Sequence, residues 1–388
     1  MITLALAGKP NCGKSTFFKA ATMANVEIAN YPFTTINPNF GVAYVRTTCP
    51  CHGLDLKCGH CIDGVRFVAV NLIDVAGLVP DAHKGKGLGN QFLDHLRQAD
   101  AILHIIDASG GTDSEGNPVG VGNHDPAEDV KFLEYEMTMW VYGILDKHWS
   151  RLSRQASVKT FSIHQGIAEV FTGLGITPED IRDAELLLKI DLVHAQMESL
   201  VPFCAEMVRT SKPMLVIGNK VDETPNSLKE KLAAQKVSFV SAASELALRN
   251  ASTAKVVTYL PGDQEFKITE GITLSPPQKA GLVKIAELMK MNHGTGVQDA
   301  INRAVFELLD RIVIYPVEDE HKFCNKQGDV LPDAFLMKKG STPHDLAFQV
   351  HTDIGKGFLY AIDARSKMRI KENHVLKDGD IIKIVSVH

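Results

Sequence analysis

Residues 8–15 carry the clearest chemical pattern in the chain. They read Gly-Lys-Pro-Asn-Cys-Gly-Lys-Ser and match G-x-x-x-x-G-K-[ST], a phosphate-binding loop. The glycines let backbone N–H groups curl around phosphate oxygens, and the helix that follows presents its N-terminal dipole to the same anion. In this pattern Lys14 reaches the β- and γ-phosphates, and the Ser15 hydroxyl ligates Mg²⁺. The pattern predicts nucleoside triphosphate binding by Asn11, Cys12, Gly13, Lys14, Ser15 and Thr16.

A second pattern, Asn219-Lys220-Val221-Asp222, follows an apolar run and concerns the base. The Asp222 carboxylate can accept hydrogen bonds from N1–H and the 2-amino group of guanine, whereas adenine offers neither donor. Asn219 would tie neighbouring loops together, and the stem of Lys220 would cover the ring. The small residues Ser241, Ala242 and Ala243 follow another strand-like run and would let a backbone N–H approach the guanine O6. GTP and GDP are therefore the expected ligands.

Three further residues are expected at the metal ion and the γ-phosphate. Asp74 ends a β-branched run and would hold Mg²⁺ through water, and Gly77 would give its N–H to the γ-phosphate. A threonine must complete the metal site, and we choose Thr35 over its neighbour Thr34. The predicted catalytic residues are Lys14, Thr35 and Gly77, and the predicted Mg²⁺ ligands are Ser15, Thr35 and Asp74.

Four of the seven cysteines lie close together in the sequence: Cys49, Cys51, Cys58 and Cys61. Their spacing, C-x-C-x₆-C-x₂-C, suits a tetrahedral structural Zn²⁺ site, although the first pair is tighter than usual. Four reduced cysteines on a β-hairpin, or disulfides in a hyperthermophile, are the alternatives. Cys12, Cys204 and Cys324 are scattered.

The elements that position these residues alternate between strands and helices. Strand-like runs span 2–7, 65–73, 101–107, 213–218 and 237–240, and helical segments span 14–23, 89–98 and 128–149. This alternation predicts an α/β fold with a mostly parallel sheet and helices on both faces.

Two regions interrupt the alternation. Residues 127–206 carry almost no strand signal, and helical spacing recurs at 128–149 and at 180–200. The C-terminal part has strand-like runs at 312–317 and 381–387 and one short helix beginning near Thr342. We predict a phosphate-loop domain (1–126 and 207–311), a helical insertion (127–206) and a small α+β domain (312–388).

Composition limits the class of protein. The 388 residues contain 41 Lys and Arg against 46 Asp and Glu, a formal charge of −5, which excludes a chain coated in basic residues for nucleic acid. No signal-peptide pattern and no run of about 18 apolar residues is present, so we expect a cytoplasmic protein without membrane or DNA partners.

Longer runs give a resemblance to a known family. The runs at 30–35 (NYPFTT), 74–79 (DVAGLV) and 84–93 (KGKGLGNQFL) resemble the Obg/YchF family of translation-factor GTPases, closest to its archaeal YchF-like branch. Residues 335–343, 345–347 and 356–363 are similar to a TGS domain, a β-grasp module. The resemblance implies a GTPase associated with the ribosome or RNA through the TGS and helical domains. Better-known YchF members carry an altered guanine loop and favour ATP, whereas this chain keeps NKVD.

Leu78 stands where many GTPases place the glutamine that orients the attacking water. We therefore expect slow hydrolysis unless another group positions the water. Asn11 suggests one substitute, because similar GTPases use this phosphate-loop asparagine to hold K⁺. His83 is either a water-positioning residue or a solvated loop histidine.

These features predict a slow GTPase acting as a nucleotide-dependent switch on the ribosome. One alternative is an RNA- or ribosome-binding scaffold in which hydrolysis is incidental, and another is an ATPase like better-known YchF members. A small-molecule phosphotransferase would not need the NKVD loop. Lys338, Lys339, Arg365, Lys367, Arg369 and Lys371 form either an RNA-binding patch or ordinary solvated charges.

Overall fold

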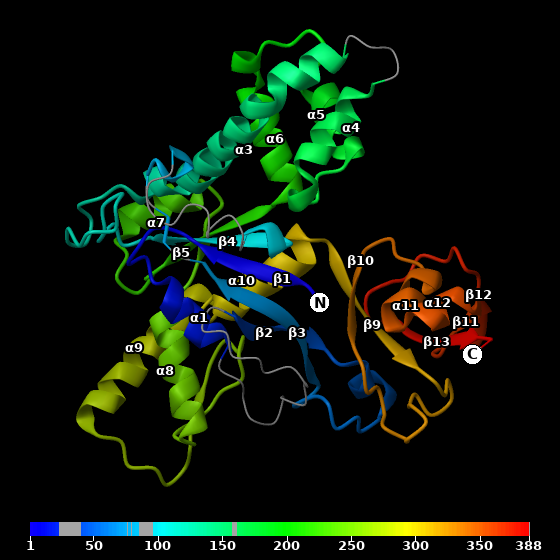
Figure 1. Cartoon of the computed structure of the whole chain (residues 1–388). Helices are drawn as coiled ribbons and strands as arrows, with labels where there is room; N and C mark the ends of the chain where they lie inside the picture. Colours follow the sequence, from blue (N-terminus) through cyan, green and yellow to red (C-terminus); the bar gives the residue numbers. More distant parts are fainter. Residues whose placement is uncertain (23–39, 76, 79, 85–95, 157–160, 388) are drawn as a thin grey trace.

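A six-stranded sheet forms the centre of the molecule. The computed structural model describes residues 1–22, 40–75, 77–78, 80–84, 96–156 and 161–387 (Figure 1). The strands are ordered β2-β3-β1-β4-β5-β6, and β2 alone is antiparallel to its neighbour β3. They span Thr3–Ala7 (β1), Phe40–Thr48 (β2), Val65–Asp74 (β3), Ala101–Asp107 (β4), Met214–Asn219 (β5) and Ser238–Phe239 (β6).

Both faces of this sheet are covered, which explains the continuous apolar runs of its central strands. Leu4 and Leu6 of β1 belong to a buried cluster with α1 (Lys14–Thr22) and α10 (Val297–Asn302), while Ala5 and Ala7 belong to a second cluster with α3 and α6. All seven residues of β4 are buried. Parallel strands covered by helices on both sides confirm the predicted α/β class.

Between β4 and β5 the described chain first forms a loop (108–125) and then four α-helices. These are α3 (Pro126–Ala156), α4 (Ile163–Val170), α5 (Pro178–Leu188) and α6 (Val201–Ser211), which extend away from the sheet (Figure 1). Below the sheet in this view lie α8 (Ala242–Thr253) and α9 (Pro276–Asn292), joined by the short hairpin β7 (Val257–Thr258) and β8 (Lys267–Ile268). The helix α7 (Asn226–Ala233) follows β5.

The helix predicted over residues 180–200 is wrong for residues 189–196, and Met197–Leu200 forms a separate 3-10 turn. Lys189 adopts a left-handed backbone with φ +54°, and its N–H closes the last turn of α5 onto the Glu185 and Leu186 carbonyls. A new helix begins at Val201 with a proline in its first turn. Val193, which continued the helical spacing beyond α5, is 40% exposed, so its apolar side chain gave a misleading periodicity.

The C-terminal part folds around a second sheet with the order β10-β9-β13-β11-β12. Its strands are β9 (Arg311–Val317), β10 (Phe335–Lys338), β11 (Phe358–Asp363), β12 (Met368–Ile370) and β13 (Ile381–Ser386); β9 and β13 are parallel. The helices α11 (Pro343–Val350) and α12 (Thr352–Lys356) accompany it, and α11 starts at Thr342 in a capping box with Asp345, as its sequence predicts.

The predicted domain boundaries at 126/127 and 311/312 fall at the starts of α3 and β9, whereas 206/207 falls inside α6. The division into domains stays a prediction. Most of the predicted helix 89–98 lies outside the described residues. Its residues 96–98 are described and are helical. Among the described helices, none combines the length and apolar character needed to cross a bilayer.

Candidate functional site

The phosphate loop lies between β1 and α1, where the carboxyl ends of the central strands meet. Lys14 Nζ donates to the carbonyls of Gly8 (3.0 Å) and Lys9 (2.8 Å), so the lysine curls over its own loop. At Gly13, φ is +95° and a Cβ would lie 2.2 Å from Asn219 Nδ2. Glycine is required there by both the backbone conformation and the close approach.

The predicted metal ligands Ser15 and Asp74 lie together. Ser15 Oγ donates to Asp74 Oδ2 over 3.1 Å. The pKa of Asp74 is raised because burial outweighs the hydrogen bond from Ser15 and the charge of Lys14, which both lower it. A hydroxyl and a carboxylate at the end of the phosphate loop are donors that suit Mg²⁺. Thr34 and Thr35 lie outside the described residues.

Gly77 and Leu78 lie against the phosphate loop. A Cβ on Gly77 would lie 3.1 Å from Pro10 Cγ, and the N–H of Leu78 donates to the Gly8 carbonyl over 3.1 Å. The Leu78 side chain is only 4% exposed and belongs to the buried cluster that includes Leu133 and Met137 of α3. The residue that follows Gly77 is thus apolar and buried.

Asn219 joins the three nucleotide loops, as its sequence context predicts. Its Nδ2 donates to the Cys12 carbonyl (3.0 Å), and its Oδ1 accepts from the N–H of Ala242 (3.1 Å). Asp222 is exposed in the turn that follows β5. Ser241 does more than the sequence suggested, because its hydroxyl caps α8 and Ala242 is already the first residue of that helix.

Asp107 is a residue of this site that sequence reasoning missed. It ends β4, is fully buried, and accepts hydrogen bonds from Lys220 Nζ (2.8 Å), Ser109 Oγ (2.6 Å) and Thr112 Oγ1 (2.9 Å). It therefore orients the lysine of the guanine loop. The available signal was a single acid at the end of an otherwise apolar strand.

The start of α3 and the glycine-rich loop before it also contact the phosphate loop. Lys9 Nζ donates to Asp129 Oδ2 (2.6 Å) and to the Thr112 carbonyl (2.8 Å), and Lys9 is 2% exposed. Burial raises the pKa of Asp129, opposed by the adjacent Lys9. Asn11 has φ +60°, and its Nδ2 donates to the Gly116 carbonyl over 3.0 Å. None of these contacts was predicted.

His83 lies against α3, with its ring held by a buried acid. Its Nδ1 is 2.7 Å from Glu136 Oε2, and the two side chains are 9% and 5% exposed. The backbone N–H groups of Asp81 and His83 also donate to this carboxylate, over 3.0 and 3.1 Å. Of the two interpretations offered by the sequence, a solvated loop histidine is wrong, because the side chain is only 9% exposed and its ring contacts Glu136.

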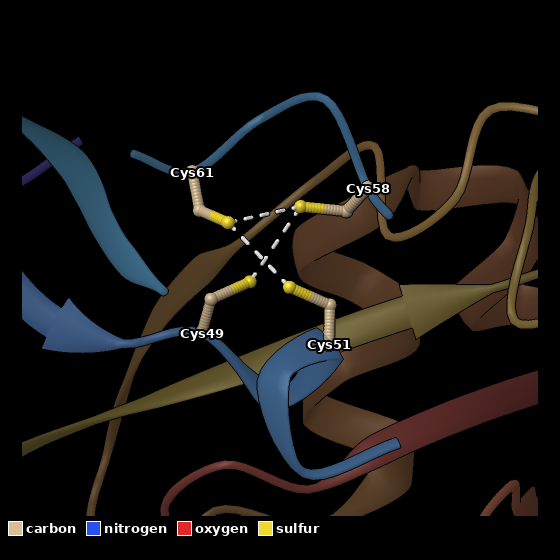
Figure 2. Close-up of side chains that lie close together, drawn as sticks. All are labelled: Cys49, Cys51, Cys58 and Cys61. Carbon is tan, nitrogen blue, oxygen red and sulfur yellow. Dashed lines mark hydrogen bonds between the residues drawn. The ribbon is translucent and has the colours of Figure 1, made fainter. Parts of the chain in front are cut away.

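The four clustered cysteines converge in a loop between β2 and β3 (Figure 2). Their Sγ atoms all lie within 4.8 Å of one another, with separations of 3.7 Å for Cys49–Cys58 and 3.5 Å for Cys51–Cys61 and Cys58–Cys61. Four thiolates about 2.3 Å from a tetrahedral Zn²⁺ would be about 3.8 Å apart. The cluster therefore fits a metal ion in its donor atoms and its dimensions, and all four residues are free thiols.

The loop that carries these thiols is tightly turned and locally hydrogen-bonded. Asp55 and Gly59 adopt left-handed conformations with φ of +51° and +69°, and the N–H of His60 donates to Cys58 Sγ over 3.4 Å. Burial raises the pKa of Cys61 to about 11. Burial also acts to raise the pKa of Cys58, but the His60 amide and the neighbouring thiols outweigh it, so this pKa is lowered.

The cysteine loop packs against the C-terminal sheet. Cys49, Cys51 and Cys58 share one buried cluster with Tyr315 and Val317 of β9. Burial and the neighbouring Cys49 raise the pKa of Tyr315, and Arg66 lowers it. Arg66 Nη2 donates to the Pro332 carbonyl (2.9 Å). Within the described residues, Arg66 Nη1 and the Tyr315 hydroxyl are buried donors without a hydrogen-bond partner.

The basic residues of the C-terminal domain do not form one patch. Lys338 and Lys339 lie at the end of β10, at one edge of the sheet, whereas residues 365–371 surround β12 at the other edge. Arg369 stacks 3.9 Å from the Tyr360 ring centroid, and Lys367 lies 4.2 Å from that of Phe323. Any contact with RNA phosphates would therefore use two separate groups of charges.

Comparison with known proteins covers the whole chain. Residues 3–135 match the family model of the 50S ribosome-binding GTPase, residues 217–319 that of the Obg-like GTPase YGR210-like, G4 motif-containing domain, and residues 323–386 that of the TGS domain. An uncharacterized GTP-binding protein of Methanocaldococcus jannaschii is 47% identical, with 100% of this chain and 99% of that protein covered. The ribosome-binding ATPase YchF of Bacillus subtilis is 27% identical, with 98% of both covered.

Solved structures agree with these matches. The crystal structure of a GTP-binding protein from Pyrococcus horikoshii is 38% identical over 100% of both chains, with a TM-score of 0.80. The Schizosaccharomyces pombe YchF GTPase, at 20% identity and a TM-score of 0.58, supports the fold, with 99% of this chain and 97% of that chain covered. The chain therefore belongs to the Obg family of GTPases, in its YchF-like branch, and is a GTP-binding protein with a C-terminal TGS domain.

Proposed function

We propose that this protein hydrolyses GTP slowly and acts as a nucleotide-dependent switch on the ribosome. The observation that carries the proposal is the position of Asn219, which fastens the guanine loop to the phosphate loop and to the start of α8. With Asp222 in the same loop, this arrangement suits guanine. YchF relatives are named ribosome-binding ATPases, which supports the ribosome as the partner.

Each predicted site residue has a proposed role in binding the nucleotide or the metal ion that follows from its chemistry. Lys14 would neutralise the β- and γ-phosphates, and Gly77 and Thr35 would contact the γ-phosphate and the metal ion. Ser15 and Asp74 would hold Mg²⁺, which bridges phosphate oxygens and offsets their charge when bound. Asp222, Ser241, Ala242 and Ala243 would surround the base. Asn11, Cys12, Gly13 and Thr16 would supply loop contacts.

Slow turnover follows from the burial of Leu78. Its side chain has no hydrogen-bonding group and lies in a cluster with α3, so it cannot orient water. Asn11 supports the further proposal that K⁺ supplies the missing transition-state charge. Turnover should therefore rise in potassium relative to sodium, and equal rates in the two salts would reject potassium activation.

Ribosome co-sedimentation tests the switch directly. The full chain is incubated with ribosomes and GDP, a non-hydrolysable GTP analogue or no nucleotide. Binding that depends on the nucleotide supports the switch, while equal binding in all three favours the scaffold. Competition between ATP and GTP for the site tests the ATPase alternative. Tighter binding of ATP would contradict guanine recognition by the NKVD loop.

We also propose that Cys49, Cys51, Cys58 and Cys61 bind a structural Zn²⁺. The support is the spacing of the four Sγ atoms, which all lie within 4.8 Å of one another. Protein purified without added zinc should contain about one equivalent, with the four thiols protected from alkylation. A ratio far below one, with all four thiols reactive, would reject the site.

A further inference from the structure

One face of α3 contacts both the phosphate loop and the segment after β3. Asp129 binds Lys9, and Glu136 binds the backbone of Asp81 and His83. The two acids are seven residues apart, which places them two turns apart on the same side of the helix. The same helix continues to Ala156 in the helical insertion, so it links the nucleotide loops to that insertion (Figure 1).

Glu136 holds its partners through three short contacts. Its carboxylate lies 3.0 Å from the N–H of Asp81, and 3.1 and 2.7 Å from the N–H and Nδ1 of His83. The residue is 5% exposed, so a bond that is lost is poorly replaced by water. Hydrogen bonds to an ionised acceptor are also stronger than neutral ones. Residues 81–83 are therefore fixed to α3.

Leu78 adds a second attachment of the same segment. Its N–H binds the phosphate-loop carbonyl of Gly8, and its side chain shares a buried cluster with Leu133 and Met137 of α3. Leu78 and Asp81 are three residues apart, and a chain of that length spans at most about 10 Å. Because this connection is short, a movement of the backbone beside Gly77 is passed on to the residues that Glu136 binds.

We propose that Glu136 is a positioning residue that couples the nucleotide bound at the phosphate loop to the helical insertion. This inference rests on the proposed switch. In GTPases the segment around D-x-x-G is ordered by contacts to the γ-phosphate and released after hydrolysis. Here that change moves Leu78, Asp81 and His83 against α3, and the helix, about 46 Å long at 1.5 Å per residue, conveys it to α4 and α5.

Hydrogen exchange of the full chain tests the coupling. Exchange across residues 163–188 is measured with GDP and with a non-hydrolysable GTP analogue, in the natural chain and in Glu136→Ala and Glu136→Gln. The natural chain should show different exchange in the two nucleotides. Glu136→Ala should reduce that difference at least threefold with GDP affinity changed less than twofold, and Glu136→Gln, which keeps one acceptor, should retain more than half of it.

Glu185→Ala is the matched control. Glu185 accepts from a histidine ring and a backbone N–H, as Glu136 does, but its partners His164 and Leu192 lie within the insertion. This change should raise exchange equally in both nucleotides and leave the difference intact. A full nucleotide-dependent difference in Glu136→Ala would overturn the coupling alone, whereas no difference in the natural chain would overturn the switch as well.

Discussion

At the scale of single residues, Asp222 is the predicted source of base choice. It lies exposed in the loop that Asn219 fastens to the phosphate loop. Asp222→Asn replaces two acceptor oxygens by one acceptor and one donor. Because hydrogen bonds to a charged acceptor contribute about 1.5–3 kcal/mol each, we expect GTP affinity to fall about a hundredfold or more.

The same variant should gain affinity for xanthosine triphosphate, whose 2-oxo group accepts a hydrogen bond from the new amide. Fluorescence titration with GTP and with xanthosine triphosphate measures both affinities and shows whether the preferred base has changed. Lower affinity for both nucleotides to the same extent would point to a damaged loop and count against base recognition by Asp222.

Asn219 and Asp107 show why motifs are only part of what the site needs. Lys14, Ser15 and Asn219 could be predicted as site residues from sequence because the phosphate-loop and NKVD patterns encode local backbone geometry. Asp107, Asp129 and Glu136 contact residues more than fifty positions away. An acid with such a partner looks like any solvated acid until the fold is known.

At the scale of elements, α3 depends on the buried pair between Lys9 and Asp129. The side chains are 2% and 7% exposed, and Asp129→Ala would leave the Lys9 ammonium buried without its counter-charge. Removing one partner of such a pair typically destabilises a protein by about 3–5 kcal/mol. Urea denaturation followed by circular dichroism should show this loss.

Asp125→Ala serves as the comparison, because the Asp125–Lys231 ion pair is exposed. Asp125 also accepts a hydrogen bond from the Ala127 N–H at the start of α3, so this variant should lower the free energy of unfolding by about 1–2 kcal/mol, less than Asp129→Ala. Replacing both Lys9 and Asp129 by apolar residues should recover much of the loss. An Asp129→Ala variant as stable as Asp125→Ala would mean that Lys9 finds another partner.

The strands and helices could be predicted from the sequence where the pattern of buried residues is regular. The strands β1, β3, β4 and β5 are mainly apolar because both faces of the sheet are covered, and each was predicted close to its bounds. The strand β2 was missed because only two of its nine residues are buried. The end of α5 was missed because the left-handed conformation of Lys189 leaves no residue signature comparable to glycine.

At the scale of the whole molecule, the cysteine loop joins the central sheet to the C-terminal sheet. If the loop holds the proposed Zn²⁺, removal of the metal by a chelator should weaken the packing between the cysteine loop and the C-terminal sheet. The reason is that Cys49, Cys51 and Cys58 share a buried cluster with β9. We expect faster proteolysis of residues 318–334 after chelation or in Cys58→Ser, while nucleotide affinity changes less than twofold.

Cys204→Ser is the matched control, because Cys204 is a buried cysteine of α6 outside this cluster. It should leave proteolysis of residues 318–334 and the zinc content unchanged. Unaltered proteolysis of the chelated protein, with zinc shown to be gone, would contradict a role of the metal in the joint.

The insertion between β4 and β5 also orders the events of synthesis. The phosphate loop, Asp74 and Asp107 leave the ribosome more than a hundred residues before Asn219, whose contact with Cys12 bridges 207 positions. Pairing of β4 with β5 must therefore wait for the helices between them, and such long-range pairing is slow. A nascent chain of this protein would possess its phosphate loop long before it could recognise guanine.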